Sequence, residues 1–385
     1  MSADDPLAAA LAAAGLAGVT PGATVPGPAP VPTAEPDRAP AAPPARWPDG
    51  AATAVGSMPG TDPREAAATV TGELPVLPAL PELPARGVGA DVIGRTAGLL
   101  VDLAVEVRPS GYRITGRPGR DQRRAVDLLR SDLDAFDEAC DPVRPPWVKL
   151  QVAGPWTLAA SIELHSGHAM LTDRGAVREL AASLAEGLRL HVAEVGARTG
   201  AAVLLQLDEP SLPTVLAGQV PTPSGYGSVR SVSENAAKDV LRELIAAVGV
   251  PVALHCCADR PPMQVLGGVG AAAIGVDATL PSVAGRTASP AALDALGEVW
   301  DADTPLLLGI VPARNPGGRP TSRALARTAF DLADRLGFDR VRLAHLAVPT
   351  PTCGLAGADP NWARQALTLC RELGEAFLDP LDERE

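Results

Sequence analysis

The chain has 385 residues, of which 46% are hydrophobic, and a formal net charge of −12 at pH 7. This size and composition permit a large buried core, and the acidic balance argues against nucleic acid or an anionic membrane as a partner. No run of about 18 apolar residues lacks charges or helix breakers, and the first residues lack the basic region of a signal peptide. We therefore expect a cytoplasmic protein whose five dispersed cysteines are thiols or metal ligands rather than disulfides.

Residues 1–46 are dominated by Ala, Pro, Gly and Thr. Such a segment buries too little apolar surface to offset the entropy lost on ordering. The composition therefore predicts a disordered Pro/Ala-rich tail over 1–46 and a folded domain over 47–380.

From Trp47 onward, short apolar runs alternate with longer stretches in which apolar residues recur every three or four positions. The expected strands are 52–58, 147–154, 202–209, 251–258, 271–278, 305–312 and 340–348, and 74–84 can contain another. The expected helices are 176–199, 234–248, 290–300 and 322–337. This alternation predicts parallel βαβ units whose sheet is covered on both faces.

The expected fold class is α/β, as a (β/α)8 TIM barrel with insertions. A doubly wound open sheet is the alternative. The absence of a Gly-x-Gly-x-x-Gly pattern after the first strand weakens a dinucleotide-binding version of that alternative.

Polar or reactive residues follow six of the expected strands at their carboxyl ends, where barrel active sites lie. They are Gly56-Ser57, Gly154-Pro155-Trp156-Thr157, Asp208-Glu209, His255-Cys256-Cys257, Asp277 and Cys353-Gly354. Core packing alone does not account for a polar tip on so many apolar strands.

His255 and Cys257 are two residues apart, so on a strand they share a face. A His-x-Cys pair supplies two ligands suited to zinc, and Cys353 and Asp277 at other strand ends are candidates for the third and fourth. The alternative is a buried strand with inert thiols, and spacing alone leaves the two interpretations even. Cys256 faces the other way, toward the helices, and is expected to pack.

The remaining candidates have simpler interpretations. Asp208 at a strand end can bind a ligand ammonium group, or else it caps a helix. His165 and His168 form a weak metal candidate on what we expect to be a solvated face. His345 is expected inside a strand as a core histidine, and Trp156 either stacks on a donor ring or packs in the core. Cys140 and Cys370 lie in helical contexts and are expected to pack, and no role is expected for His191.

Taken in order, five motifs resemble those of the C-terminal catalytic barrel of the cobalamin-independent methionine synthase family. They are GSMP (56–59), AGPWTL (153–158), LQLDEPSL (205–212), LHCC (254–257) and CGL (353–355). The resemblance spans about 50–375, so the chain looks like a short member without the extra N-terminal barrel. The wider superfamily includes uroporphyrinogen decarboxylase and coenzyme M methyltransferases.

The resemblance implies a zinc-dependent methyltransferase that forms methionine from homocysteine. His255, Cys257 and Cys353 match the family's zinc ligands, and Asp277 lies where the family has a zinc-binding Glu. Asp208 matches the carboxylate that holds the amino group of homocysteine. The loop that meets the substrate carboxylate matches Gly56 and Ser57.

Two departures from the family pattern bear on the substrates. The family's second substrate-binding Glu is absent from 114–124, the region that looks equivalent, and its proton-donating His is replaced by the loop 312–315. The expected methyl donor is therefore either methyltetrahydrofolate or a methylcorrinoid protein, whose leaving group needs no proton. The alternatives are a decarboxylase acting on a tetrapyrrole and a degenerate barrel that binds an amino acid or thiol without catalysis.

Overall fold

The computed structural model describes residues 46–318 and 320–379. The tail predicted over 1–46 lies outside these residues, apart from Arg46. Within the described part, no helix is both long and apolar enough to span a membrane.

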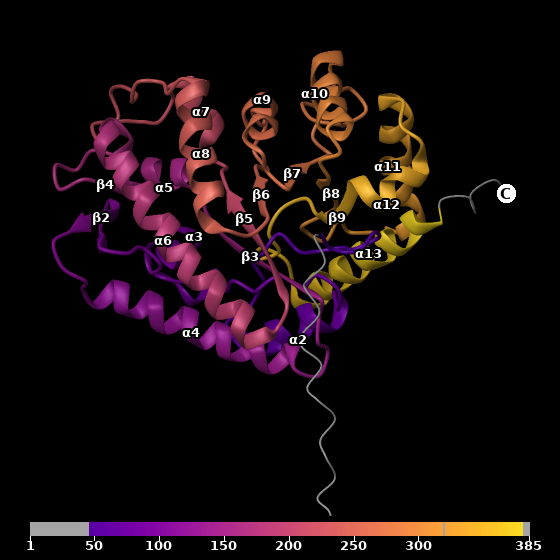
Figure 1. The fold of residues 1–385 in the computed structure, drawn as a ribbon, viewed down its shortest axis with the longest axis horizontal. Coiled ribbons are helices and arrows are strands. Elements are labelled where there is room, and N and C mark those ends of the chain that lie inside the picture. Colours follow the sequence, from indigo (N-terminus) through magenta and orange to yellow (C-terminus); the bar gives the residue numbers. More distant parts are fainter. Residues whose placement is uncertain (1–45, 319, 380–385) are drawn as a thin grey trace, which may run out of the picture. The chain divides into compact units, whose positions relative to one another are not determined.

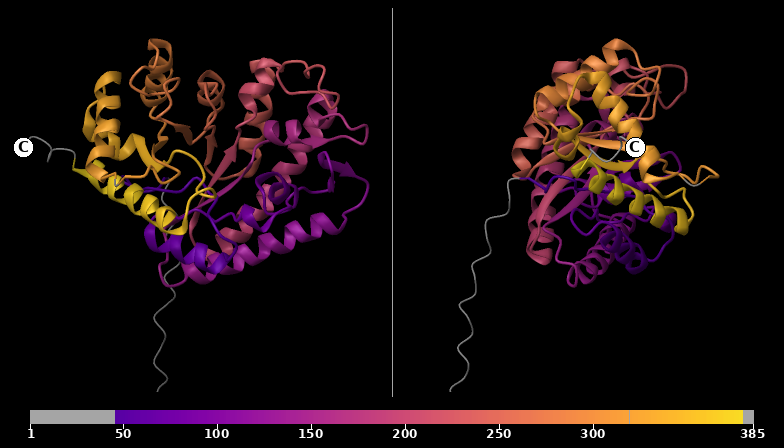
Figure 2. Two further views of the ribbon diagram at one scale, coloured as in Figure 1. Left: turned by 180° about the vertical axis from the view of Figure 1, so that it is seen from behind. Right: turned by 90° about the vertical axis from the view of Figure 1, so that its right-hand side faces the viewer.

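The main sheet is parallel and curled, with helices on its outer face (Figures 1 and 2). Its strand order is β3-β5-β6-β7-β8-β9. The strands are β3 (Trp147–Ala153), β5 (Ala202–Asp208), β6 (Val252–His255), β7 (Ala273–Asp277), β8 (Leu306–Val311) and β9 (Ala347–Pro351). The predicted α/β class is confirmed, with six regular strands in this sheet.

Two extended segments lie between β9 and β3. The first is held to β9 by a hydrogen bond from Thr53 N to Pro349 O at 3.2 Å. It is joined to the second by a bond from Glu82 N to Gly56 O at 3.2 Å. The second segment contacts β3, where Leu80 N donates to Lys149 O at 2.9 Å. These segments correspond to the strands predicted at 52–58 and 74–84. In the second segment, four prolines between positions 75 and 84 remove the N–H groups that a regular strand needs.

The strand predicted over 340–348 is wrong. Those residues form η4 (Arg340–Arg342) and α12 (Leu343–Leu346), and β9 begins only at Ala347. Leu343 and Leu346 are buried and three residues apart, which is helical spacing, whereas 340–348 was predicted as a strand because it is a short apolar run.

The four predicted helices are confirmed as α6 (Arg174–Thr199), α8 (Glu234–Val248), α10 (Pro290–Asp301) and α11 (Ser322–Leu336). The long helices that were not predicted are α2 (Pro63–Glu73), α4 (Arg120–Cys140) and α13 (Pro360–Leu378). Short helical segments are η1 (Pro84–Arg86), α3 (Val92–Ala97), α5 (Pro155–Ser161), η2 (Met170–Thr172), α7 (Leu212–Ala217), α9 (Met263–Leu266) and η3 (Gly267–Val269). A small second sheet contains β1 (Ala104–Arg108), β2 (Gly111–Thr115) and β4 (Ile162–Glu163).

The two faces of the main sheet have separate cores. The inner core takes one residue from each strand, together with Trp47, Ala51 and Leu77. Those strand residues are Trp147, Leu204, Ala253, Ala273, Leu307 and Val348. The alternate residues, such as Leu150, Leu205 and Ile274, belong to the larger core shared with the helices. The inner face is therefore sealed by apolar side chains near the amino ends of the strands.

Candidate active site

On the inner face of the sheet, the side chains change from apolar to polar toward the carboxyl ends of the strands. Two residues beyond Trp147, Leu204 and Ala253 on the same face come Lys149, Gln206 and His255. Two residues further are Gln151, Asp208 and Cys257. The same periodicity that builds the core thus gathers the candidate residues at one end of the sheet.

His255 and Asp208 are direct partners in the β5–β6 register. The Nδ1 atom of His255 lies 2.7 Å from Oδ1 of Asp208, and the two side chains are only 8% and 14% exposed. The imidazole also lies close to Gly275 on β7, where an added Cβ would be 2.9 Å from its Cδ2. The carboxylate and the small neighbour together fix the position of the ring.

Cys257 and Cys353 meet at the mouth of the sheet, with their Sγ atoms 3.5 Å apart. The hydrogen bond with Cys257 lowers the pKa of Cys353 to about 6, and the same contact raises the pKa of Cys257 well above its usual value. The positive charge of a protonated His255 would lower the pKa of Cys353 further. The contact therefore favours a thiolate on Cys353, the form that binds metals and acts as a nucleophile.

The loop at Gly56 and Ser57 contacts the turn that follows Cys353. Leu355 N donates to Ser57 O at 2.8 Å, and a Cβ on Gly354 would lie 2.0 Å from Ser57 Oγ. Gly56 has φ +152° and lies against the side chain of Gln151. The first and last motifs of the chain are thus adjacent in space.

Asp277 ends β7, but its Oδ1 accepts hydrogen bonds from the backbone N and hydroxyl of Thr279, at 2.9 and 2.6 Å. In the described part of the chain, no group of three or more His, Cys, Asp or Glu side chains is arranged to hold a metal ion. The structure thus pairs His255 with Asp208 and Cys257 with Cys353. It does not bring Asp277 into contact with either pair.

Three inward-facing residues were missed by the sequence analysis: Glu82, Lys149 and Gln206. Glu82 is 6% exposed, and its Oε1 is buried without a hydrogen-bond partner. Burial raises the pKa of Glu82 to about 7, with Arg95 opposing the rise and Asp208 adding to it. Lys149 and Gln206 were detectable as polar residues on the inner face of otherwise apolar strands.

Residues 51–376 match the family described as cobalamin-independent synthase, catalytic domain. The chain belongs to this family. The predicted resemblance is therefore confirmed over most of the described residues.

Two solved structures have a similar fold. One is a B12-independent methionine synthase from Shewanella sp. W3-18-1, at 11% identity and a TM-score of 0.54, over 86% of this chain and 99% of that one. Another is a methyltransferase from Methanosarcina mazei, at 17% identity and a TM-score of 0.50, over 84% and 94%. At these identities the likeness shows the fold. No curated protein matches the chain.

The donor types at the mouth fit the zinc that the family resemblance implies. Zinc takes thiolate sulfur and imidazole nitrogen, and the lowered pKa of Cys353 favours its thiolate. Because Nδ1 of His255 contacts Asp208, the other ring nitrogen, Nε2, is the one that could bind a metal. The chemistry of this donor set therefore suits a soft divalent metal.

Glu209, the neighbour of Asp208, has a structural role. Its carboxylate is fully buried and accepts from Trp156 N at 2.9 Å, Thr157 N at 2.8 Å and Thr157 Oγ1 at 2.7 Å, at the start of α5. Burial raises the pKa of Glu209 to about 7, against the effect of these donors. A Cβ on Gly154 would lie 2.4 Å from Glu209 Oε1, so a side chain there would displace this carboxylate.

The prediction for His345 is wrong, whereas the prediction for His165 and His168 is confirmed. His345 is half-buried on α12 and not in a strand core; its Nδ1 lies 3.0 Å from Asp49 Oδ1 and its Nε2 lies 3.3 Å from Asp303 Oδ2. His165 and His168 are exposed in a turn, as expected for a solvated face.

The packing expectations are confirmed for two other residues. Trp156 is 3% exposed, and its indole donates to Ala237 O at 3.3 Å. Cys256 is fully buried in the outer core.

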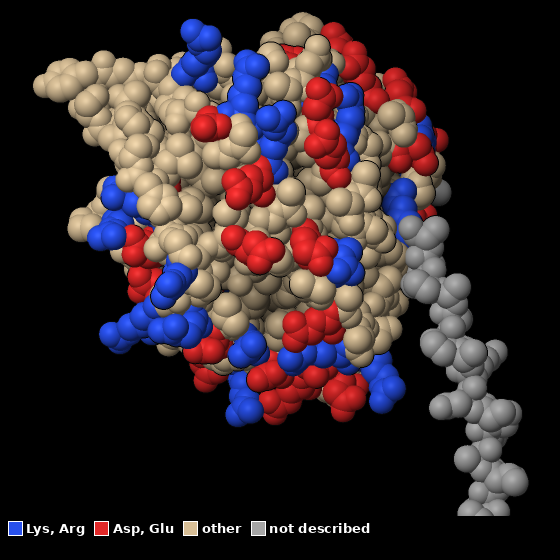
Figure 3. Space-filling view, turned by 60° about the vertical axis from the view of Figure 1, so that its left-hand side comes forward, with Lys and Arg blue, Asp and Glu red and all other residues tan. Residues whose placement is uncertain are grey.

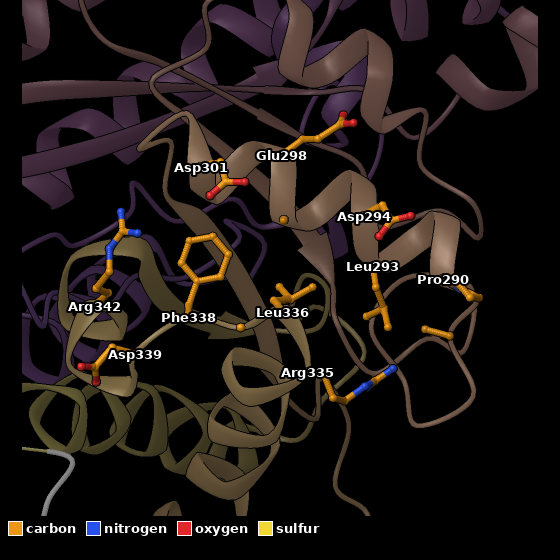
Figure 4. Close-up of a pocket in the computed structure, with 13 residues that line it drawn as sticks. Pro290, Leu293, Asp294, Glu298, Asp301, Arg335, Leu336, Phe338, Asp339 and Arg342 are labelled. Atoms are coloured by element: carbon orange, nitrogen blue, oxygen red, sulfur yellow. The ribbon is translucent and has the colours of Figure 1, made fainter.

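A groove of about 730 Å³ lies elsewhere, between α10 and the segment 335–342 (Figure 4). Leu293 and Phe338 line it, beside the acidic residues Asp294, Glu298 and Asp301. None of its lining residues is a candidate site residue.

On the face drawn in Figure 3, acidic and basic side chains are interspersed.

Proposed function

We propose that the protein is a zinc-dependent methyltransferase that transfers a methyl group to the thiol of homocysteine, giving methionine. The observation that carries the proposal is the 3.5 Å approach of Cys257 and Cys353, with His255 nearby, in a chain of the cobalamin-independent synthase family. This arrangement suits sulfur chemistry because it gathers soft donors at one end of the sheet.

Zinc would be held by His255, Cys257 and Cys353. Asp277 is the candidate fourth ligand, since Thr279 uses only its Oδ1 and leaves Oδ2 for a metal ion. Bound zinc would lower the pKa of the substrate thiol and favour the nucleophilic thiolate.

Two carboxylates would bind the substrate ammonium group. Asp208 uses Oδ1 for Gln206 and His255, which leaves Oδ2 available. Glu82 has a buried Oε1 without a hydrogen-bond partner. The charge of Asp208 is close enough to raise the pKa of Glu82. An ammonium group between them would compensate both charges. Glu82 would thus supply the second acid that the sequence analysis did not find in 114–124, which lies at β2 and the start of α4.

The loop of Gly56 and Ser57 would bind the substrate carboxylate through its backbone and hydroxyl groups. Ser57 Oγ lies beside the turn of Cys353, so a substrate held there has its thiol near the proposed metal ligands.

The methyl donor would be methyltetrahydrofolate or a methylcorrinoid protein. The loop after β8 contains no histidine to protonate a leaving group, and its Arg314 guanidinium lies against Gly357. A folate leaving group benefits from a proton donor, whereas a corrinoid does not need one. This difference favours the corrinoid.

We also infer that the two extended segments between β9 and β3 act as two further strands and complete an eight-stranded barrel with the six regular strands. Their hydrogen bonds link β9 to residue 53, residue 56 to residue 82, and residue 80 to β3. The inner core includes Ala51 and Leu77 from these segments. Closure of this kind leaves no free edge and encloses the site.

Metal analysis of purified protein tests the ligand assignment. The wild type should bind roughly one zinc ion per chain, the count for a single site of this type. Cys257→Ser and Cys353→Ser should lose the metal, and Cys256→Ala, on the opposite face of the strand, should keep it. Wild-type zinc content in Cys257→Ser contradicts the assignment.

A further inference from the structure

Lys149 is one of two lysines in the chain and is fully buried inside the curled sheet. Its Nζ lies 2.9 Å from Val55 O, 2.9 Å from Gln206 Oε1 and 3.2 Å from Gln151 Oε1. All three partners are acceptors, so an ammonium group at this position donates one proton to each. The buried charge therefore has a full set of hydrogen bonds.

Lys149 fixes the orientation of the Gln206 amide. Because Oε1 accepts from the ammonium group, Nε2 faces the other way and donates to Val55 O at 3.0 Å and Asp208 Oδ1 at 2.8 Å. A flipped amide would turn its N–H groups toward the ammonium and its oxygen toward the carboxylate. Both contacts would be repulsive, so the network permits one orientation.

Asp208 connects the oriented Gln206 amide to His255. Its Oδ1 accepts from Gln206 and lies 2.7 Å from His255 Nδ1. A carboxylate only accepts hydrogen bonds, so the imidazole carries a proton on Nδ1, and its neutral form then has a lone pair on Nε2.

We propose that Lys149 is a positioning residue that acts through Gln206 and Asp208 to hold His255 as the Nδ1–H tautomer, with Nε2 free to bind a ligand. The inference rests on the proposed function only in naming zinc as that ligand. Lys149 itself touches neither the metal ligands nor the substrate-binding loop residues Gly56 and Ser57.

Nitrogen NMR of the full-length, metal-free protein labelled in histidine tests the proposal without metal or substrate. The chain has five histidines, so the signals of His255 are assigned by their loss in His255→Gln. The wild type should show the Nδ1–H tautomer. Lys149→Met and Gln206→Met should each shift His255 toward a mixture of tautomers, and the control Lys238→Met, on α8, should not.

The double variant separates a relay from two independent effects. If Lys149 acts through Gln206, the shift in Lys149→Met/Gln206→Met equals that of Gln206→Met alone. Unchanged His255 signals in Lys149→Met overturn the proposal, and so does an additive double variant.

Zinc affinity gives a second measurement, by competition with a chelator. Outer partners of a ligating histidine contribute about 10- to 100-fold to metal affinity, and we expect Lys149→Met to weaken binding by about 10-fold. A tautomer shift in a protein that binds no zinc refutes the proposed function and leaves the relay intact. Zinc-dependent activity in the wild type, together with a metal-free His255 tautomer that is unchanged in Lys149→Met, refutes the relay alone.

Discussion

The Cβ position of Gly354 lies 2.0 Å from Oγ of Ser57, so a side chain at residue 354 would displace this hydroxyl. The bond from Leu355 N to Ser57 O at 2.8 Å holds the same contact. The proposed metal ligand and the proposed carboxylate-binding hydroxyl are therefore positioned by one junction.

Gly354→Ala should displace the Ser57 hydroxyl and raise the KM for homocysteine by about 10-fold, the loss of one hydrogen bond to a charged group. Steady-state kinetics measures the effect. The control Gly297→Ala, at an open position on α10, should behave as wild type. Adding Gly354→Ala to Ser57→Gly should cause little further loss, because the clashing hydroxyl is already gone; an unchanged KM in Gly354→Ala contradicts the proposed role of Ser57.

Binding of homocysteine should weaken in acid because burial raises the pKa of Glu82 to about 7. The substrate ammonium binds the ionised carboxylate, so the Kd should rise about tenfold per pH unit below that value. Glu82→Gln should weaken binding by about 10- to 100-fold above pH 7 and remove this pH dependence. Calorimetry across the range tests it, with the exposed Glu65→Gln as control. A wild-type Kd that is flat with pH counts against Glu82.

Glu209→Gln should lower the free energy of unfolding by about 1–3 kcal/mol, because an amide nitrogen would face the donors of Trp156 and Thr157. Urea denaturation measures this loss, and the exposed Glu179→Gln should lie close to wild type. A loss of catalysis with stability unchanged would instead assign Glu209 to the reaction.

His191 should make the protein sensitive to acid. Burial lowers the pKa of His191 to about 3, so the folded state binds fewer protons than the unfolded state between that value and about 6.5. Stability therefore falls as the pH drops through this window. Between neutral pH and about pH 5, the wild type should lose about 2 kcal/mol more than His191→Leu.

Denaturant unfolding at the two pH values gives the comparison. The exposed His168→Gln is the control and should lose as much as the wild type. Equal losses in the wild type and in His191→Leu would show that this histidine is protonated in the folded state.

The sequence predicted the polar strand ends well because strand periodicity is local. The pairing of His255 with Asp208 follows from two buried strands in register. The same periodicity contained Lys149 and Gln206, whose importance became visible only when neighbouring strands placed them beside one another.

Other features depend on tertiary contacts that a single sequence does not reveal. The segment 340–348 contains a short apolar run, yet its leucines are buried on a helix. Asp277 lies at a strand end as predicted, but the nearby Thr279 takes its carboxylate oxygen. Glu82 escaped notice because prolines obscured the strand pattern around it.

Methyl transfer to homocysteine by the zinc-loaded protein tests the central claim most directly. Isotope-labelled methyltetrahydrofolate and a methylcorrinoid are supplied separately, and labelled methionine is measured. The account predicts methionine from at least one donor with the wild type, and none with Cys257→Ser. No methionine from either donor, with zinc bound and homocysteine present, contradicts the account and leaves a barrel that binds its ligand without catalysis.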